Sequence, residues 1–434
     1  MKTKDFTNYY NIGAAEENIT PNPGVDLYSL DGVSRNSDKI HSDLVACAVA
    51  ISHNKCCIII VSLDLIWIDD EFSLKIKKWV KTKSILTNTN VVIVATHSHS
   101  TPQISNKITN TARPNAQYND ILYSKICNLI LKSIENMDQC YAKLSISSPG
   151  ISVNRRKKIL DPSQLKKFNF KTKIANRPNL KTQTDDLLYS IWFYDKNGIE
   201  KAVLLNYACH ASLYRKNSVS SDYPGMIRAY LKNNLSPELK VCFLQGFSGD
   251  IKANIVESQC SNQRMSIKEI LFSIIFDNYR FKKNITDYDI KKFSKILALN
   301  AIKNENTYDI HPKLSYLNKT IKLPLHNKLN FINLELCYIS LGKKLKMIMI
   351  GGEVFSQYSI WMRNYLSNKG IHLLTVGYCN DIVGYLPTKQ AINEGGYEVE
   401  RTTDFPLKTT ISEEIESIIK SEFIKVVNKC QENY

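Results

Sequence analysis

The chain has 434 residues, of which 43% are hydrophobic and 23% are charged, and its formal net charge is +16 at pH 7. This length can bury a large core, and the composition is typical of a soluble globular protein. The lysines are spread along the whole chain, with no helix-turn-helix signature, zinc-finger spacing or basic stripe interleaved with aromatic residues, so we expect no nucleic-acid partner.

Cysteine usage and the first residues of the chain bear on its compartment. The eleven cysteines form no CxxC pair, which favours free thiols in a reducing compartment over a disulfide framework. The N-terminus has no apolar segment of the signal-peptide type, and no uncharged apolar run reaches the length of about 18 residues that a membrane span needs. We therefore expect a cytoplasmic protein without a transmembrane segment, whose charge permits peripheral contact with an anionic membrane.

Apolar periodicity predicts strands and helices mixed throughout the chain. Ile- and Val-rich runs at Cys56–Leu63 and Val91–Ala95 predict strands buried on both faces. Helical spacing of apolar residues predicts helices from Phe72 to Val80 and over Asn119–Met137. The later predicted elements are hairpin strands Leu188–Tyr194 and Ala202–Tyr207 around an Asn-Gly turn, strand Val241–Leu244, helix Asp289–Lys303, antiparallel strands Ser315–Leu325 and Phe331–Leu341, strand Lys346–Ile350, a helix at about Glu353–Leu366 and a helix over Ser412–Cys430.

This pattern predicts an α/β protein in which a mixed β-sheet core is flanked by helices. The sequence has no internal repeat and no sharp change in composition, so we expect residues 1–434 to form one large domain. Two polar stretches without clear periodicity, Gln103–Tyr118 and Arg156–Asp185, are expected to be long loops that shape a substrate entrance.

Polar residues follow several predicted strands, at the positions where α/β proteins assemble their sites. His97 and His99 come just after Val91–Ala95, and in extended backbone residues two apart point to the same side. His210 follows another strand, and Glu353 follows two glycines at the start of a predicted helix. Two histidines, a carboxylate and an open position would make a hydrolytic zinc site.

Each of these residues also has a plainer interpretation. The pair His97 and His99 could cap a turn, His210 could be a core histidine with satisfied hydrogen bonds, and Glu353 could interact with a helix dipole. The other histidines lie in polar or basic surroundings and are expected at the surface: His41, His53, His311, His326 and His372. Residue type and spacing alone leave these alternatives open.

Ten segments that run through nearly the whole chain add a second line of argument. They are IGAAEENITP (12–21), IHSDLVACAVAI (40–51), IIIVSLDL (58–65), ATHSHSTP (95–102), VNRR (153–156), NYACHA (206–211), SDYPGMI (221–227), QGFSGDIKAN (245–254), GGEVF (351–355) and VGYCNDIVGYLPTKQAINEGGYEVE (376–400). In their residues and in their order along the chain, these segments resemble the neutral/alkaline ceramidase family. The resemblance implies a zinc amidase that cleaves an N-acyl amide bond by metal-activated water.

The resemblance also implies roles for individual residues. The family's metal ligands match His97 in THSH, His210 in ACH, Glu353 in GGE and Tyr385 in VGYLPT, for one Zn²⁺ per chain. Its further active-site residues match Tyr397 in GGYEVE and Arg155 in VNRR, and His99 would face the substrate. The structural alternatives are that Tyr397 packs in the core and that Arg155 belongs to the basic loop that follows VNRR.

Two departures from the family pattern bear on mechanism and substrate. Lys252 stands where the family carries a serine once considered a nucleophile, which excludes a covalent serine route at that position. Secreted members are longer and carry an immunoglobulin-like domain after the catalytic one, so the resemblance is to a short form. A cytoplasmic amidase on another N-acylated lipid or peptide-like amine therefore fits at least as well as a ceramidase.

We predict a zinc-dependent amidohydrolase with a small-molecule N-acyl amide substrate and a single catalytic domain over residues 1–434. His99 and Tyr397 are the candidates for stabilising the oxyanion, and Arg155 would orient a polar substrate group. One alternative is a metal-dependent ester or lactone hydrolase on the same scaffold, and another is a non-catalytic binding protein with a vestigial site. The oligomeric state has no signature in the sequence.

Overall fold

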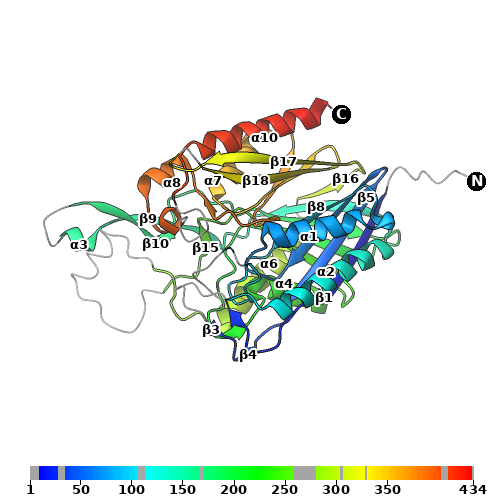
Figure 1. The fold of residues 1–434 in the computed structure, drawn as a ribbon, viewed down its shortest axis with the longest axis horizontal. Helices are drawn as coiled ribbons and strands as arrows, with labels where there is room; N and C mark the ends of the chain where they lie inside the picture. The colour runs from blue at the N-terminus through cyan, green and yellow to red at the C-terminus, as the bar shows by residue number, and fades with distance from the viewer. Residues whose placement is uncertain are drawn as a thin grey trace, which may run out of the picture.

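The structure is a computed structural model that describes residues 9–27, 35–105, 107, 113–165, 170–257, 280–303, 306–327, 330–401 and 409–432. Two β-sheets pack face to face, and helices cover the outer face of each sheet, which gives four layers (Figure 1). The predicted fold class, a mixed β-sheet core flanked by helices, is confirmed.

The larger sheet has nine strands within the described ranges. Eight lie in the order β14-β12-β11-β8-β1-β5-β6-β7, and β16 pairs with β8. The pairs β6–β7 and β12–β14 are parallel, and the other pairs are antiparallel. The bounds are β1 Tyr10–Asn18, β5 Val45–His53, β6 Cys56–Leu63, β7 Thr89–Ala95, β8 Asp138–Ser147, β11 Leu188–Tyr194, β12 Glu200–Tyr207, β14 Lys240–Gln245 and β16 Thr307–Ile310.

The second sheet has the strand order β17-β18-β19-β21, with β19 and β21 parallel. Its strands are β17 Leu314–Pro324, β18 Phe331–Leu341, β19 Leu345–Ile350 and β21 His372–Val376. Ile339 and Met347 from this sheet share one buried cluster with Val49 and Ile60 from the larger sheet. The core between the sheets is therefore formed by the facing side chains of both.

Alternation along the strands assigns side chains to the two faces of the larger sheet. In β5, Val49 and Ile51 pack into the core between the sheets, whereas Ala48 and Ala50 lie in the cluster beneath the outer helices. Both faces of the strand are buried, which explains the continuous apolar run in its sequence.

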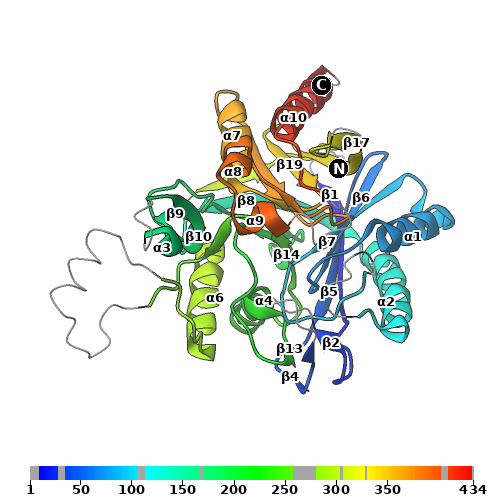
Figure 2. The same cartoon turned by 60° about the vertical axis from the view of Figure 1, so that its left-hand side comes forward.

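Three pairs of helices cover the outer faces of the sheets (Figure 2). The first pair packs over β5, β6 and β7, the second over β11, β12 and β14, and the third over β18 and β19. The pairs are α1 Asp70–Lys81 with α2 Ala116–Glu135, α4 Asp222–Asn234 with α6 Asp287–Ile302, and α7 Ser356–Ser367 with α10 Ile415–Glu432. Asp69 caps α1 through Phe72 N, and Thr286 forms a capping box with Asp289 at α6.

The remaining elements lie outside the two main sheets and the six helices that cover them. They are β2 Asp26–Leu27, β3 Arg35–Asn36, β4 Lys39–Ile40, η2 Ser84–Leu86, β9 Ser152–Leu160, α3 Pro162–Leu165, β10 Thr172–Asn179, β13 Ser218–Val219, β15 Ile251–Ala253, β20 Glu353–Val354, β22 Tyr385–Leu386, α8 Lys389–Glu394 and α9 Tyr397–Glu400. Strands β10, β9 and β15 form a small antiparallel sheet beside the main layers.

Two expectations are wrong in part. The stretch Arg156–Asp185 is not one long loop, because it contains the end of β9 and all of β10, which pair as a hairpin. Its side chains are polar and mostly exposed or half-buried, so no apolar alternation marks these strands. The predicted helix at Glu353 begins only at Ser356, and Glu353 lies in the two-residue strand β20 instead.

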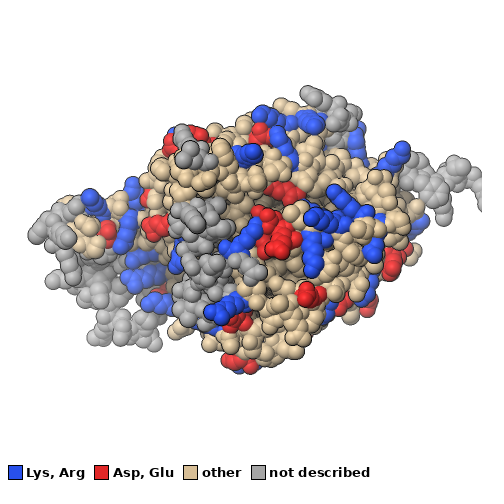
Figure 3. All heavy atoms as spheres, viewed as in Figure 1, with Lys and Arg blue, Asp and Glu red and all other residues tan. Residues whose placement is uncertain are grey.

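Some expectations reach beyond the described residues. Of the stretch Gln103–Tyr118, residues 106 and 108–112 lie outside them, and α2 already begins at Ala116. The described cysteines are all free thiols, and Cys260 lies outside the described ranges. No helix in the described part of the chain has the length and apolar character of a membrane span. Lys and Arg are interspersed with Asp and Glu over the face seen in Figure 3.

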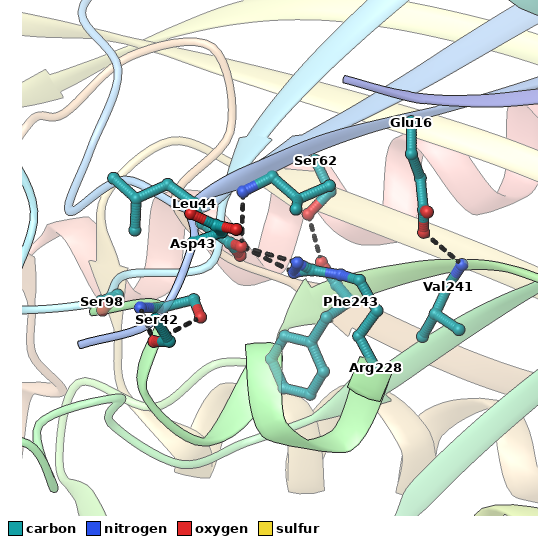
Figure 4. Close-up of polar contacts among 12 residues, drawn as sticks. Glu16, Ser42, Asp43, Leu44, Ser62, Ser98, Arg228, Val241 and Phe243 are labelled. Carbon is teal, nitrogen blue, oxygen red and sulfur yellow. Dashed lines mark hydrogen bonds and ion pairs between the residues drawn. The ribbon is translucent and has the colours of Figure 1, made fainter. Parts of the chain in front are cut away.

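A buried ion pair ties α4 to the larger sheet. Both guanidinium NH₂ groups of Arg228 donate to Asp64 Oδ2, at 2.7 and 2.6 Å, and the same oxygen accepts from Val45 N at 2.9 Å. Polar contacts surround Arg228: Glu16 accepts from Val241 N, and Ser62 Oγ donates to the carbonyl of Phe243 (Figure 4). Asp64 directly follows β6, so the pair anchors the carboxyl end of that strand.

Replacing Asp64 by Asn should lower the free energy of unfolding by about 3–5 kcal/mol, because the Arg228 charge would stay buried without a counter-charge. Urea unfolding followed by circular dichroism measures this. The control is Lys132→Met at the exposed pair with Glu17, which should change the free energy by less than about 1 kcal/mol. Equal effects of the two substitutions would contradict the prediction.

Candidate metal centre

The candidate ligands lie just beyond the carboxyl ends of parallel strands. His97 follows β7, His210 follows β12, and Glu353 follows β19. Open α/β sheets place their sites at this edge, because the loops there converge where adjacent strands end. Here the edges of both sheets meet: Gly377 N donates to Gln245 O at 2.9 Å.

The predicted ligands come together in space. Glu353 Oε2 lies 3.1 Å from His210 Nε2 and 3.4 Å from His97 Nε2. His99 Nε2 lies 3.2 Å from His97 Nε2, and ring nitrogens of all three histidines lie within 4.8 Å of one another. All four side chains are buried. The carboxylate and the imidazoles thus surround one small volume inside the protein.

The backbone brings His97 and His99 together by a route other than the expected one. Strand β7 ends at Ala95, and His97 has a left-handed backbone with φ 61°, so the two residues do not lie on an extended strand. Two hydrogen bonds hold the turn: Ser98 Oγ donates to Ser220 O at 2.8 Å, and His99 N donates to Ala211 O at 3.0 Å. The rings still meet edge to face.

Backbone carbonyls fix the tautomers of two histidines. His97 Nδ1 lies 2.8 Å from Ile66 O, and His210 Nδ1 lies 2.7 Å from Ser248 O. A carbonyl oxygen only accepts, so each Nδ1 must carry the proton, and in a neutral ring Nε2 is then a bare lone pair. The atoms that face Glu353 Oε2 from both rings are therefore acceptors.

Burial and neighbouring charges set the protonation of the site. Burial, with Arg155 nearby, lowers the pKa of His210 to about 3, and burial beside His97 and His210 holds the pKa of His99 well below its usual value. Neutral imidazole and ionised carboxylate are the forms that bind a metal.

This set of possible metal ligands fits a divalent cation. Two imidazole nitrogens and a carboxylate oxygen, all acceptors, face one another without a proton to share, and a cation between them removes that repulsion. Ligand atoms about 2.0–2.1 Å from a tetrahedral centre lie about 3.3–3.4 Å apart, close to the separations seen here. Imidazole with carboxylate is a ligand combination typical of zinc.

Tyr385 and Arg155 border the ligand cluster. Glu353 and Tyr385 are directly paired in the parallel strands β20 and β22, so their side chains stand next to each other. Arg155 Nη2 donates to the Tyr385 hydroxyl at 3.1 Å and to Gly249 O at 2.7 Å. Burial raises the pKa of Tyr385 and Glu353 adds to this, whereas the Arg155 charge opposes both.

Tyr397 lies next to Tyr385, and Glu398, the residue after Tyr397, orients Arg155. The rings of Tyr385 and Tyr397 are 6.3 Å apart and tilted edge to face. Glu398 accepts from Arg155 Nε at 2.8 Å and from Arg156 Nη1 at 2.6 Å, and all three charged groups are buried. Our sequence reasoning did not find Glu398, although it directly follows the predicted Tyr397.

Tyr378 is a second residue that our sequence reasoning missed. Its ring stacks on His97 with a centroid separation of 4.0 Å, and its hydroxyl hydrogen-bonds with Ser248 Oγ at 3.0 Å. Because Ser248 O also accepts from His210, Tyr378 links the supports of both histidines. The only sequence signal is its place in VGYCND, two residues after the end of β21.

Comparison with protein families matches residues 10–278 to the family described as neutral/alkaline non-lysosomal ceramidase, N-terminal. The chain belongs to this family. The matched segment includes His97, His99, Arg155 and His210, and family membership indicates a hydrolase that acts on an amide bond.

Solved ceramidase structures share the fold. The neutral ceramidase from Pseudomonas aeruginosa superposes with a TM-score of 0.74 at 13% sequence identity, over 96% of this chain and 74% of that one. A structure titled as a ceramidase complexed with C2 gives the same TM-score and identity, over 98% of this chain and 76% of that one. Among curated proteins, none matches this chain.

Gly249, in the segment GFSGD, lets this part of the backbone approach the backbone of Glu353 closely. Gly249 N donates to Val354 O at 2.9 Å, and a Cβ at Gly249 would lie 2.5 Å from Glu353 O and 3.0 Å from the Phe355 ring. The backbone of Glu353 would therefore have to shift in any variant with a side chain at position 249.

Gly249→Ala should weaken zinc affinity at least tenfold, because the Glu353 backbone would move away from the histidines. It should also lower the free energy of unfolding by about 1–3 kcal/mol. Competition with a chromophoric chelator measures the affinity. The control is Gly370→Ala, whose Cβ meets no atom within 4 Å. Its left-handed backbone, with φ 61°, also makes this variant less stable, but its zinc affinity should be unchanged. Undiminished affinity in Gly249→Ala would rule out the close approach as a constraint.

Proposed function

We propose that this chain is a zinc-dependent amidase that hydrolyses the amide bond of a small N-acylated amine. The observation that carries the proposal is the convergence of His97 Nε2, His210 Nε2 and Glu353 Oε2 as three buried acceptors. Membership of the ceramidase family supports an amide as the bond that is cleaved. The Pseudomonas neutral ceramidase makes ceramide one member of the substrate panel.

His97, His210 and Glu353 would hold the metal, with Tyr385 beside Glu353 as the fourth ligand. The Arg155 guanidinium next to the Tyr385 hydroxyl favours the ionised phenol that would bind a cation. When bound, Zn²⁺ supplies a Lewis acid and lowers the pKa of a coordinated water toward neutrality.

The remaining residues move the proton and stabilise charge. His99 borders the centre as a neutral imidazole, so it can take a proton from the attacking water and deliver it to the amine nitrogen as the C–N bond breaks. Tyr397 lies near Arg155, and Glu398 holds Arg155 in place. The Tyr397 hydroxyl and the Arg155 guanidinium can both donate toward the oxyanion of the tetrahedral intermediate. The products are a carboxylic acid and a free amine.

Protein purified without chelator should contain about one zinc per chain by elemental mass spectrometry. His97→Ala and His210→Ala should each lose this metal, because each removes a ligand whose tautomer is fixed by the backbone. His326→Ala, at an exposed histidine, serves as the control and should keep it. A wild-type chain that holds no metal, and takes up none when zinc is added, would replace the hydrolase proposal with the binding-protein alternative.

His99→Ala should keep its zinc and lose about 10²–10⁴-fold in kcat, since a general acid-base group contributes about that much. Turnover is measured on an N-acyl amide and on the ester of the same acyl group. Loss of zinc in this variant would make His99 a ligand instead, which its 3.2 Å contact with His97 Nε2 also allows. Cleavage of the ester alone would favour the ester-hydrolase alternative over the amidase.

A further inference from the structure

Lys252 stands on the face of the small sheet that bears Arg155. Strand β15 pairs antiparallel with β9, and Lys252 is opposite Val153, two residues from Arg155. Paired residues and residues two apart lie on the same face, so Lys252 and Arg155 are diagonal neighbours. The residues flanking Lys252 in β15, Ile251 and Ala253, are buried on the other face.

The half-buried ammonium group of Lys252 has no carboxylate partner in the described part of the chain. The ammonium group lies over the ring of Phe281, 5.1 Å from the ring centroid. Two buried acids, Glu398, whose charge raises the pKa of Lys252, and Asp250, two residues before it in the chain, already have partners. Glu398 binds two arginines, and Asp250 accepts from Asn154 Nδ2 at 2.7 Å and from Ser356 N at 2.7 Å.

Positive charges surround Lys252. Burial lowers the pKa of Lys252 to about 7, and the charges of Arg155 and Arg215 contribute to this. An anion bound beside Lys252 would relieve this crowding of positive charge and would restore the full charge of the ammonium group.

We propose that Lys252 is a specificity-determining residue that binds an anionic group of the substrate, a carboxylate or a phosphate, close to the scissile amide. The preferred substrate is then an N-acyl amine that carries an acid group, rather than a neutral N-acyl alcohol. The inference rests on the proposed amidase function and narrows its substrate class. The family's serine at this position would leave the same place uncharged.

The test compares three substrates with one acyl chain: N-lauroylglycine, N-lauroyl-O-phosphoethanolamine and neutral N-lauroylethanolamine. Wild-type enzyme should show at least tenfold higher kcat/KM for one of the anionic substrates, mainly through KM. Lys252→Met should reduce this preference at least tenfold, and Lys252→Arg should keep part of it because it keeps the charge. The favoured anionic substrate identifies carboxylate or phosphate as the bound group.

The control for the substitution is Lys143→Met. Lys143 is a half-buried strand lysine whose ammonium also lies against a ring, that of Tyr141 at 5.9 Å, and this variant should keep the wild-type preference. Equal kcat/KM for all three substrates, or a preference that Lys252→Met leaves intact, would overturn the inference and leave the amidase proposal standing.

A binding measurement separates this inference from the proposed function. Isothermal titration calorimetry with N-lauroylglycine, N-lauroyl-O-phosphoethanolamine and N-lauroylethanolamine needs no turnover, and it compares wild type with Lys252→Met and Lys252→Arg after their thermal unfolding has been checked. Tighter binding of an anionic probe that weakens at least tenfold in Lys252→Met supports the role of Lys252 even if no amide is cleaved. Equal binding of all three probes by the wild type rejects it.

Discussion

Two hydrogen bonds from imidazole Nδ1 to backbone carbonyls set the chemistry of this site. Ile66 O and Ser248 O oblige His97 and His210 to present bare Nε2 atoms toward Glu353. The carbonyls lie in the segments that follow β6 and β14, strands that each pair in parallel with the strand preceding the histidine they orient. The sheet therefore decides the protonation pattern of the site, because a change of register would separate each ring from its acceptor.

The site also depends on the packing of one sheet against the other. The histidines and Ser248 follow strands of the larger sheet, whereas Glu353 and Tyr378 follow strands of the second. Backbone hydrogen bonds join the two sheets at this edge, such as Ala95 N to Tyr378 O at 3.1 Å. Because the core between the sheets is apolar and closely packed, it holds these groups at fixed separations.

The sequence predicted those parts of the candidate site that lie next to strongly periodic strands. His97 and His210 follow apolar runs whose ends are easy to read, and the order of the family segments assigned Glu353, Tyr385, Tyr397 and Arg155. The sequence did not predict the roles of Glu398 and Tyr378, because these roles arise only from tertiary contacts; Arg155 and Glu398 are 243 positions apart in the chain. It did not predict the hairpin β9–β10, because the strands of this hairpin have no apolar face. The start of α7 was predicted at Glu353, because two glycines precede that residue.

The left-handed backbone at His97 implies a trade-off between stability and function. A residue with a Cβ costs about 1–2 kcal/mol in this conformation, and glycine adopts it freely. His97→Gly would relieve that strain, but it would also remove the imidazole that stacks on Tyr378 and faces Glu353. The backbone at this position therefore suits glycine, whereas the candidate site requires histidine. The proposed function is maintained against a local backbone cost of that size.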